Sequence, residues 1–368
     1  MNYSSELNGL IDNMLVPPGH GVFTVQTAKE NKESLEQLLY GTNQNIQKIW
    51  RQTMTKSSLA TPYLLGICSD CGGGIQRGAN WGPLFIRENI YHKNKNLFQE
   101  LGDIRIIPHL LHDKYLNQET IRSCRKALYG NENSDLPVSP LSMTEKFLDQ
   151  FYRDNPAAKI LSLGGDHSVS YPLFKSFILS RSKSEKVGLL HFDAHTDLLD
   201  KRLGIDLCFG SWTYHVMPYF ESPQQVVQVG IRSTGQDRNH WESQFGLTQI
   251  WTQEVTQQGI EKIALQIIRQ FEQQGVQSLY ISIDIDAIDE SYVSATGTPE
   301  PEGLAPYQIH GIIEKVAQHF PVTGADLVEV APFVNARPSK TTNPEPLSTL
   351  NVAGDLAILL GEKLARGN

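Results

Sequence analysis

The segment Val-Gly-Leu-Leu-His-Phe-Asp-Ala-His-Thr-Asp, residues 187–197, decides the fold. It begins with an apolar run, Val187–Phe192, which is typical of a strand buried on both faces of a parallel sheet. It ends with potential metal ligands at alternate positions, Asp193, His195 and Asp197. In open α/β sheets, functional groups gather just beyond the carboxyl ends of the strands. The segment therefore predicts a buried parallel sheet with a polar site at the carboxyl end of this strand.

Six further apolar runs repeat the strand pattern along the chain. They are Tyr63–Cys68, Ile104–Ile107, Lys159–Leu163, Val226–Val229, Ser278–Ile283 and Ala325–Val330. Helical patterns separate the later runs, and the clearest places apolar residues on one helix face from Ile260 to Phe271. This alternation predicts βαβ units, a mostly parallel sheet and hence an α/β fold.

The first sixty residues differ from the rest of the chain. They are polar, with helical patterns around Ser34–Tyr40 and Gln44–Met54, and Pro62 closes the segment. We interpret residues 1–60 as an N-terminal extension and residues 61–368 as one large domain, because a domain of that size can bury a substantial core.

Composition and charge argue against several classes of function. The 368 residues carry a formal net charge of −8 and no clustered basic stripe, so nucleic acid and anionic membranes are not expected partners. No segment approaches the length of a membrane span, and the N-terminus lacks the pattern of a secretory signal. Four scattered cysteines are too few for a disulfide framework. We therefore expect a cytoplasmic protein, and its acidic balance suits a cationic substrate.

Two more strand ends carry the same kinds of side chain. Asp284 and Asp286 follow the run Ser278–Ile283 and, as alternate residues, point the same way. His167 follows another run, within Gly-Gly-Asp-His-Ser. A single residue of this kind is commonly a helix cap or a satisfied polar group. Four acids close together would repel one another without cations, so the clusters predict two divalent ions; the mixture of carboxylate and imidazole without thiolate suits Mn²⁺.

Together these motifs resemble the ureohydrolase family of arginase, agmatinase, guanidinobutyrase and formimidoylglutamase. The resemblance covers about residues 62–365 and rests on Gly-Gly-Asp-His-Ser (164–168), Asp-Ala-His-Thr-Asp (193–197), Ser-Ile-Asp-Ile-Asp (282–286), Ala-Thr-Gly-Thr-Pro-Glu-Pro-Glu-Gly-Leu (295–304) and Asp-Leu-Val-Glu-Val-Ala-Pro (326–332). It implies the arginase-like fold, three αβα layers around a mostly parallel sheet. It also implies a small guanidino or amidine substrate and a homo-oligomer, either a trimer or a hexamer.

The resemblance further implies a ligand set for two divalent cations, Mn²⁺ first and Ni²⁺ as the alternative. One cation is expected on His167, Asp193, Asp197 and Asp284, and the other on Asp193, His195, Asp284 and Asp286. Two such cations would lower the pKa of a shared water and hold the resulting hydroxide against the guanidinium carbon. Glu329 would bind the guanidinium through paired charge-assisted hydrogen bonds. Asp286 would stabilise the tetrahedral intermediate and assist protonation of the leaving group.

Two positions depart from the family's pattern. Phe209 stands where relatives carry a His that shuttles protons, so water, Asp286, His215 or His191 must take that role. Leu199 replaces an Asn that reads the amino-acid head of arginine in arginase, which argues against arginase activity.

We therefore expect an agmatinase-like amidinohydrolase that releases urea from a guanidino compound without an α-amino-acid head. Three alternatives stay open. They are a guanidine hydrolase that converts free guanidine to urea and ammonia with Ni²⁺, a formimidoylglutamase, and a noncatalytic metal-binding homologue.

Overall fold

A nine-stranded sheet forms the centre of the protein in the computed structural model, which describes residues 3–54, 61–71, 76–334 and 344–366. The strand order is β1-β3-β2-β4-β9-β8-β5-β6-β7, and only β1 runs antiparallel to its neighbour. The strands are β1 (Leu15–Val16), β2 (Tyr63–Ile67), β3 (Gln99–Ile104), β4 (Ile160–Gly164), β5 (Val187–Phe192), β6 (Val226–Ile231), β7 (Thr248–Trp251), β8 (Ser278–Asp284) and β9 (Val322–Val328). The predicted α/β class and mostly parallel sheet are confirmed.

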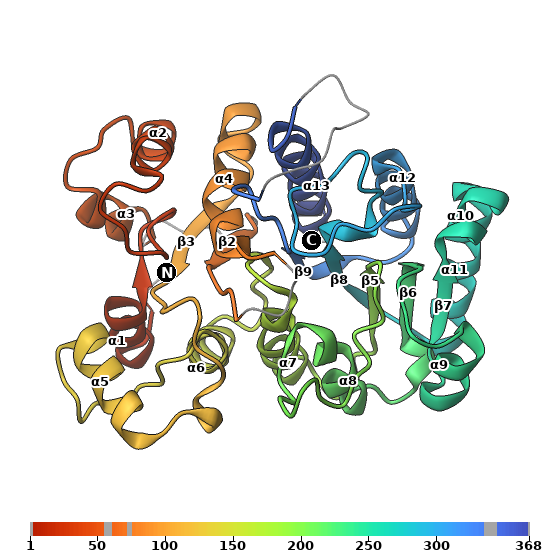
Figure 1. The fold of residues 1–368 in the computed structure, drawn as a ribbon, viewed down its shortest axis with the longest axis horizontal. Helices are drawn as coiled ribbons and strands as arrows, with labels where there is room; N and C mark the ends of the chain where they lie inside the picture. The colour runs from red at the N-terminus through yellow and green to blue at the C-terminus, as the bar shows by residue number, and fades with distance from the viewer. Residues whose placement is uncertain (1–2, 55–60, 72–75, 335–343, 367–368) are drawn as a thin grey trace.

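Helices cover both faces of the sheet, which gives the three αβα layers that the family resemblance implied (Figure 1). In that view α4, α12 and α13 lie above the sheet, and α6, α7 and α8 lie below it. The helices are α1 (Ser5–Met14), α2 (Lys29–Tyr40), α3 (Ile46–Met54), α4 (Gly82–Lys93), α5 (Gln118–Tyr129), α6 (Pro140–Asp154), α7 (Ser170–Ser180), α8 (Trp212–Val216), α9 (Arg238–Phe245), α10 (Thr252–Gln258), α11 (Ile260–Gln274), α12 (Pro306–Val316) and α13 (Leu347–Arg366). Among the described residues, no helix is long and apolar enough to span a bilayer.

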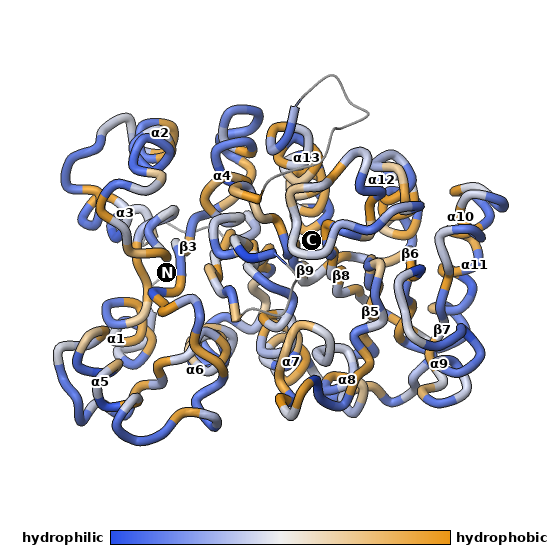
Figure 2. The backbone as a smooth tube through the Cα atoms, in the orientation of Figure 1, coloured by the Kyte–Doolittle hydropathy of each residue, from blue (hydrophilic) through white to orange (hydrophobic). Residues whose placement is uncertain are grey.

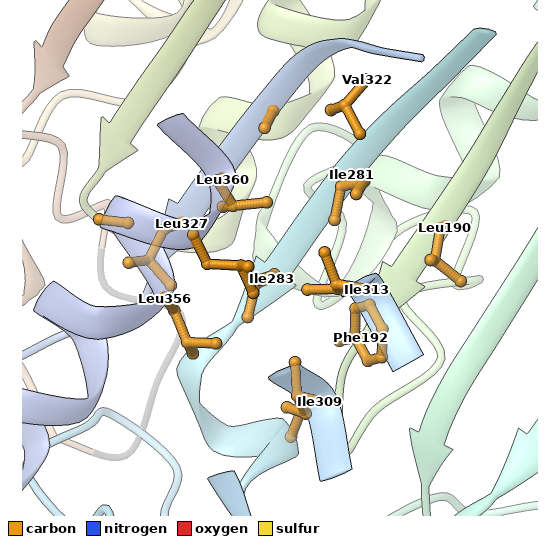
Figure 3. Packing of buried hydrophobic residues seen from close by; sticks show 14 of the residues in the cluster. Leu190, Phe192, Ile281, Ile283, Ile309, Ile313, Val322, Leu327, Leu356 and Leu360 are labelled. Atoms are coloured by element: carbon orange, nitrogen blue, oxygen red, sulfur yellow. The ribbon is translucent and has the colours of Figure 1, made fainter. Parts of the chain in front are cut away.

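Strand alternation decides which side chains reach the site. Ile281 and Ile283 of β8 pack in one hydrophobic cluster with residues of α12 and α13 (Figure 3). Successive strand residues point to opposite faces, so Ser282 and Asp284 point into the layer below the sheet, where Tyr280 packs. The apolar face thus anchors the strand, and the polar face carries the site.

β3 differs most from the sequence prediction, while β9 begins three residues before and ends two residues before the predicted run Ala325–Val330. The apolar run Ile104–Ile107 was expected to be a strand, whereas β3 ends at Ile104 and begins five residues earlier, at Gln99. Its polar residues Glu100 and Asp103 are buried because both pair with Arg87, at 2.9 and 2.6 Å. Because the strand carries buried charged residues, its hydropathy pattern does not look like that of a buried strand.

Residues 3–54 pack against the edge of the same sheet. Ser4 caps α1, its hydroxyl accepting from the Leu7 N–H at 3.1 Å, and the apolar face of α1 is buried. β1 then pairs with β3, and α3 buries Trp50 and Met54. Hydrophilic residues concentrate on peripheral helices such as α5, α9 and α10 (Figure 2). The division of the chain at residue 60 stays a prediction.

Candidate metal centre

Four neighbouring strands bring the predicted site residues to one end of the sheet. β4, β9, β8 and β5 are consecutive in the strand order. The site residues are His167 after β4, Asp193, His195 and Asp197 after β5, Asp284 and Asp286 at the end of β8, and Glu329 after β9. Because the carboxyl ends of parallel strands meet at one edge, residues far apart in sequence become neighbours in space.

The first ligand group surrounds the imidazole of His167. Its Nδ1 atom lies 3.2 Å from Asp193 Oδ2, 3.2 Å from Asp197 Oδ2 and 3.1 Å from Asp284 Oδ2. All four side chains are buried, and Nδ1 has no hydrogen-bond partner. One nitrogen and three carboxylate oxygens therefore face a common point without bonding one another, which is the geometry a cation would satisfy.

A hydrogen-bond chain behind His167 fixes which nitrogen carries the proton. The Ser282 hydroxyl donates to Asp326 Oδ1 at 2.6 Å, so it accepts at 3.1 Å from the Nε2–H of His167. Tyr280 donates to the other oxygen of Asp326 at 2.7 Å. A hydrogen-bonded Nε2–H leaves the lone pair on Nδ1, as ligand histidines require.

The second ligand group forms around His195. Its Nδ1 atom lies 3.3 Å from Asp193 Oδ1 and 3.2 Å from Asp286 Oδ2. On the far side of the ring, Nε2 lies 3.4 Å from Glu300 Oε1. Thr298 donates to Asp286 Oδ2 at 2.9 Å. Asp193 thus takes part in both groups, one oxygen in each, as a bridging ligand would.

The protonation of these groups reflects an excess of buried negative charge. Burial and the neighbouring Asp286 raise the pKa of Asp284, and burial with Asp193 raises the pKa of Asp197. Burial opposes a charge on His167, but its carboxylate neighbours outweigh that effect and raise its pKa. The pKa of His195 is raised for the same reasons. The site attracts positive charge, and its residues fit divalent cations.

Glu329 lies beside the first ligand group. Its side chain is only 4% exposed, and Oε1 accepts from the backbone N–H of His167 at 2.8 Å. Burial and the nearby Asp284 raise the pKa of Glu329. Its φ of +63°, like the +51° of Asp197, is unusual for a residue other than glycine. Backbone strain of this kind concentrates at functional sites.

The proton-shuttle candidates have other partners. His215 Nε2 lies 3.2 Å from the carbonyl oxygen of Asp200 and 2.9 Å from that of Asp206. It therefore donates to backbone acceptors and stabilises the loop between these two residues. His191 Nε2 lies 2.9 Å from Asp193 Oδ2. The Arg202 guanidinium lies over the ring of Phe209, with 4.8 Å between its Cζ atom and the ring centroid.

Sequence reasoning missed the residues that support the ligands. Ser282 stands inside a recognised motif, but its role depends on Asp326 in the neighbouring strand. Glu300 likewise meets His195 only in the fold. The sequence carries no direct signal for such contacts because strand order decides them.

Comparison with known proteins identifies the family of this chain. A model of the arginase family matches residues 60–344. The chain belongs to the arginase family. The mitochondrial guanidino acid hydrolase of Homo sapiens is 32% identical over 291 residues, which cover 73% of this chain and 70% of that protein. The mitochondrial agmatinase of Gallus gallus is 36% identical over 184 residues, covering 47% of this chain and 50% of that protein.

Solved structures show the same fold. The proclavaminate amidino hydrolase of Streptomyces clavuligerus superimposes with a TM-score of 0.65 at 21% identity, covering 84% of this chain and 92% of that protein. The relatives place this arginase-family protein on the agmatinase-like branch, as the sequence motifs indicated.

Proposed function

We propose that this protein is a binuclear-metal, agmatinase-like amidinohydrolase that releases urea from a guanidino compound. As a member of the arginase family it is a hydrolase that acts on guanidino C–N bonds. The observation that carries the two-metal proposal is Asp193, whose Oδ2 faces the His167 group and whose Oδ1 faces the His195 group.

The ligand sets follow from this sharing. His167, Asp193, Asp197 and Asp284 would hold one divalent cation, and Asp193, His195, Asp284 and Asp286 the other. Bound Mn²⁺ or Ni²⁺ would lower the pKa of a water molecule and so supply a nucleophile at neutral pH.

The chain's own residues supply binding and proton transfer. Glu329 keeps one oxygen on the His167 N–H, so its second oxygen is available to the guanidinium. A carboxylate in this buried place makes charge-assisted bonds that orient the reacting carbon. Asp286, held by Thr298 and by the Ala194 N–H at 3.2 Å, carries a proton from the attacking water to the leaving nitrogen. Phe209 has no ionisable group, so Asp286 carries this role without a shuttle histidine.

A guanidine hydrolase is the second candidate, and bulky residues beside the site favour it. Trp212 is fully buried, with its ring centroid 5.0 Å from that of His167 and 4.9 Å from that of His191. Phe209 lies on the adjoining turn. Large aromatic side chains restrict the space beside the ligands and suit a small substrate.

Assembly and location are proposals that rest on the sequence alone. We propose a homo-oligomer, trimeric or hexameric, located in the cytoplasm. Light scattering on the purified protein tests the first, and imaging of the tagged protein tests the second.

Urea release tests the function. Protein stripped of metal and reloaded with Mn²⁺ or Ni²⁺ is assayed against agmatine, 4-guanidinobutyrate, arginine and guanidine, with formamide followed for formimidoylglutamate. Turnover of one guanidino compound, lost in Asp286→Asn, supports the proposal and names the substrate. Formamide from formimidoylglutamate alone would replace it with formimidoylglutamase. If none of the compounds is hydrolysed although two metals are bound, a noncatalytic homologue is favoured.

A further inference from the structure

A row of buried polar side chains crosses the sheet beneath the ligands. Strands covered on both faces are normally rich in Val, Ile and Leu. Here register neighbours on β9, β8, β5, β6 and β7 are Asp326, Ser282, His191, Gln228 and Gln249, all 0% exposed. Buried polar groups destabilise a fold unless they are hydrogen-bonded, so such a row needs partners along its whole length.

The hydrogen bonds that join the residues of this row on β7, β6 and β5 all run in one direction. The indole N–H of Trp251 can only donate, and it lies 3.2 Å from Gln249 Oε1. Gln249 Nε2 therefore donates to Gln228 Oε1, at 2.9 Å. Gln228 Nε2 in turn donates to the carbonyl oxygen of Thr196 at 2.6 Å and to His191 Nδ1 at 3.1 Å. The Thr196 carbonyl only accepts, so it fixes the same orientation independently.

This direction determines the tautomer of His191. A neutral imidazole whose Nδ1 accepts must carry its proton on Nε2. That nitrogen lies 2.9 Å from Asp193 Oδ2, so His191 donates to the carboxylate shared by the two ligand groups. His191 also lies close enough to His167, Asp193 and Asp197 to be considered a ligand. Its Nε2 is occupied by a proton, however, which excludes it as a ligand in this tautomer.

We propose that Gln249, Gln228 and His191 form a one-way hydrogen-bond chain that positions Asp193, so that each of its oxygens faces one cation. The backbone N–H of His195 holds the other oxygen, Oδ1, at 2.6 Å. With a donor on each oxygen, the carboxylate cannot rotate away from either ligand group. The inference rests on the proposed two-metal function, but it assigns positioning roles to residues that bind neither metal nor substrate.

The alternative partner of His191 shows how the chain would fail. The Thr213 hydroxyl lies 3.5 Å from Nδ1. Without the Gln228 donor, Nδ1 could carry the proton and donate to Thr213. Nε2 would then present a lone pair to Asp193 Oδ2, and the contact would become repulsive.

Isosteric substitutions test the chain. Gln228→Met and Gln249→Met keep the side-chain length but remove the amide. Gln225→Met is the matched control, because Gln225 is also a buried glutamine but bonds away from the site: it donates to the Val187 carbonyl oxygen at 3.0 Å and accepts from the Ser222 N–H at 2.9 Å. Mn²⁺ affinity is measured by equilibrium dialysis, and the coupling between the two ions by electron paramagnetic resonance.

Loss of a residue that supports ligands typically lowers metal affinity about 10- to 100-fold. We expect Gln228→Met to weaken binding of the second Mn²⁺ by about this factor and to alter the spectrum of the coupled pair. Gln249→Met should do the same more weakly, because one amide separates it from His191. Gln225→Met should lower thermal stability and leave affinity and spectrum unchanged.

Two variants of His191 separate positioning from ligation. His191→Gln retains an N–H donor near the Nε2 position and should still bind two Mn²⁺ with a wild-type spectrum, whereas His191→Leu should not. Equal losses in both variants would make His191 a ligand and overturn the proposal. A wild-type spectrum and affinity in Gln228→Met would also overturn it.

Failure of this inference can be told from failure of the proposed function. If wild-type protein binds fewer than two Mn²⁺, the two-metal function fails and the inference falls with it. If wild-type protein binds two and Gln228→Met behaves like Gln225→Met, only the positioning chain is wrong. If Gln228→Met does not fold, the Mn²⁺ affinities and spectra of Gln249→Met and His191→Gln test the positioning chain instead.

Discussion

Replacing Glu329 with Gln removes the substrate-binding charge and little else. The amide oxygen of Gln can still accept from the His167 N–H, the 2.8 Å bond of the wild type. The second carboxylate oxygen, however, becomes an NH₂ group, which would face the N–H donors of a guanidinium. The charge-assisted bond from the second oxygen to the guanidinium is therefore lost.

The size of the effect follows from that bond. A hydrogen bond to a charged partner contributes about 1.5–3 kcal/mol, so its loss should cost about 2 kcal/mol of transition-state stabilisation. That corresponds to a fall in kcat/KM of about thirtyfold. The assay is initial-rate urea release by Mn²⁺-loaded protein, with metal content measured on the same samples.

The matched control is Glu261→Gln, because the side chain of Glu261 is 82% exposed on α11, where it pairs with Lys315. Its kcat/KM should equal that of the wild type. A fall of less than fivefold in Glu329→Gln, with two metals still bound, would refute the assignment of Glu329 as the guanidinium carboxylate.

Three further predictions concern the ligands and the fold. The raised pKa values of His167 and His195 stabilise the metal-free protein below about pH 6.5, and this contribution is lost as pH rises towards their folded-state values. Metal binding strengthens as the ligands lose protons, so the difference in melting temperature between metal-loaded and metal-free protein should grow from about pH 6 to 9; a constant difference would contradict this. Ser282→Ala removes the acceptor that fixes the His167 tautomer and should weaken metal binding at least about tenfold by equilibrium dialysis, and unchanged affinity would count against that role. Arg87→Leu leaves two buried carboxylates without their cationic partner and should lower the free energy of unfolding in urea by about 3–5 kcal/mol. A loss below about 1 kcal/mol would show that their other hydrogen bonds, from Tyr91 to Glu100 and from the backbone N–H groups of Gly19 and Gly21 to Asp103, are sufficient.

The sequence predicted the central strands because their composition is unambiguous. β5 is the apolar run Val187–Phe192 at the predicted bounds, and β4 and β8 lie within one residue of theirs. The candidate ligands were predictable for a related reason. Each follows a recognisable strand, and parallel strands bring their carboxyl ends together.

The edge strands were less predictable. β7 (Thr248–Trp251) has four residues, half of them polar, and β1 has two. Neither offers enough periodicity to distinguish a strand from a loop. The bounds of β3 were not predicted because its buried acids pair with Arg87, and this contact forms only in the folded protein.

The supporting residues of the site could not be predicted, since their roles depend on strand order. Gln228 and Gln249 look like ordinary polar residues in their own segments. They become significant only because β6 and β7 pair in a register that places both beside His191. Without that register, His191 was only a shuttle candidate, whereas the structure shows a donor to Asp193.

Metal stoichiometry tests the central claim most directly. Metal-free protein is titrated with Mn²⁺, and bound metal and urea release are measured at each step on the substrate identified by the panel. The two ligand groups that share Asp193 predict saturation at two ions per chain, with turnover appearing as the second ion binds. Saturation at one ion per chain with full turnover would contradict the binuclear account.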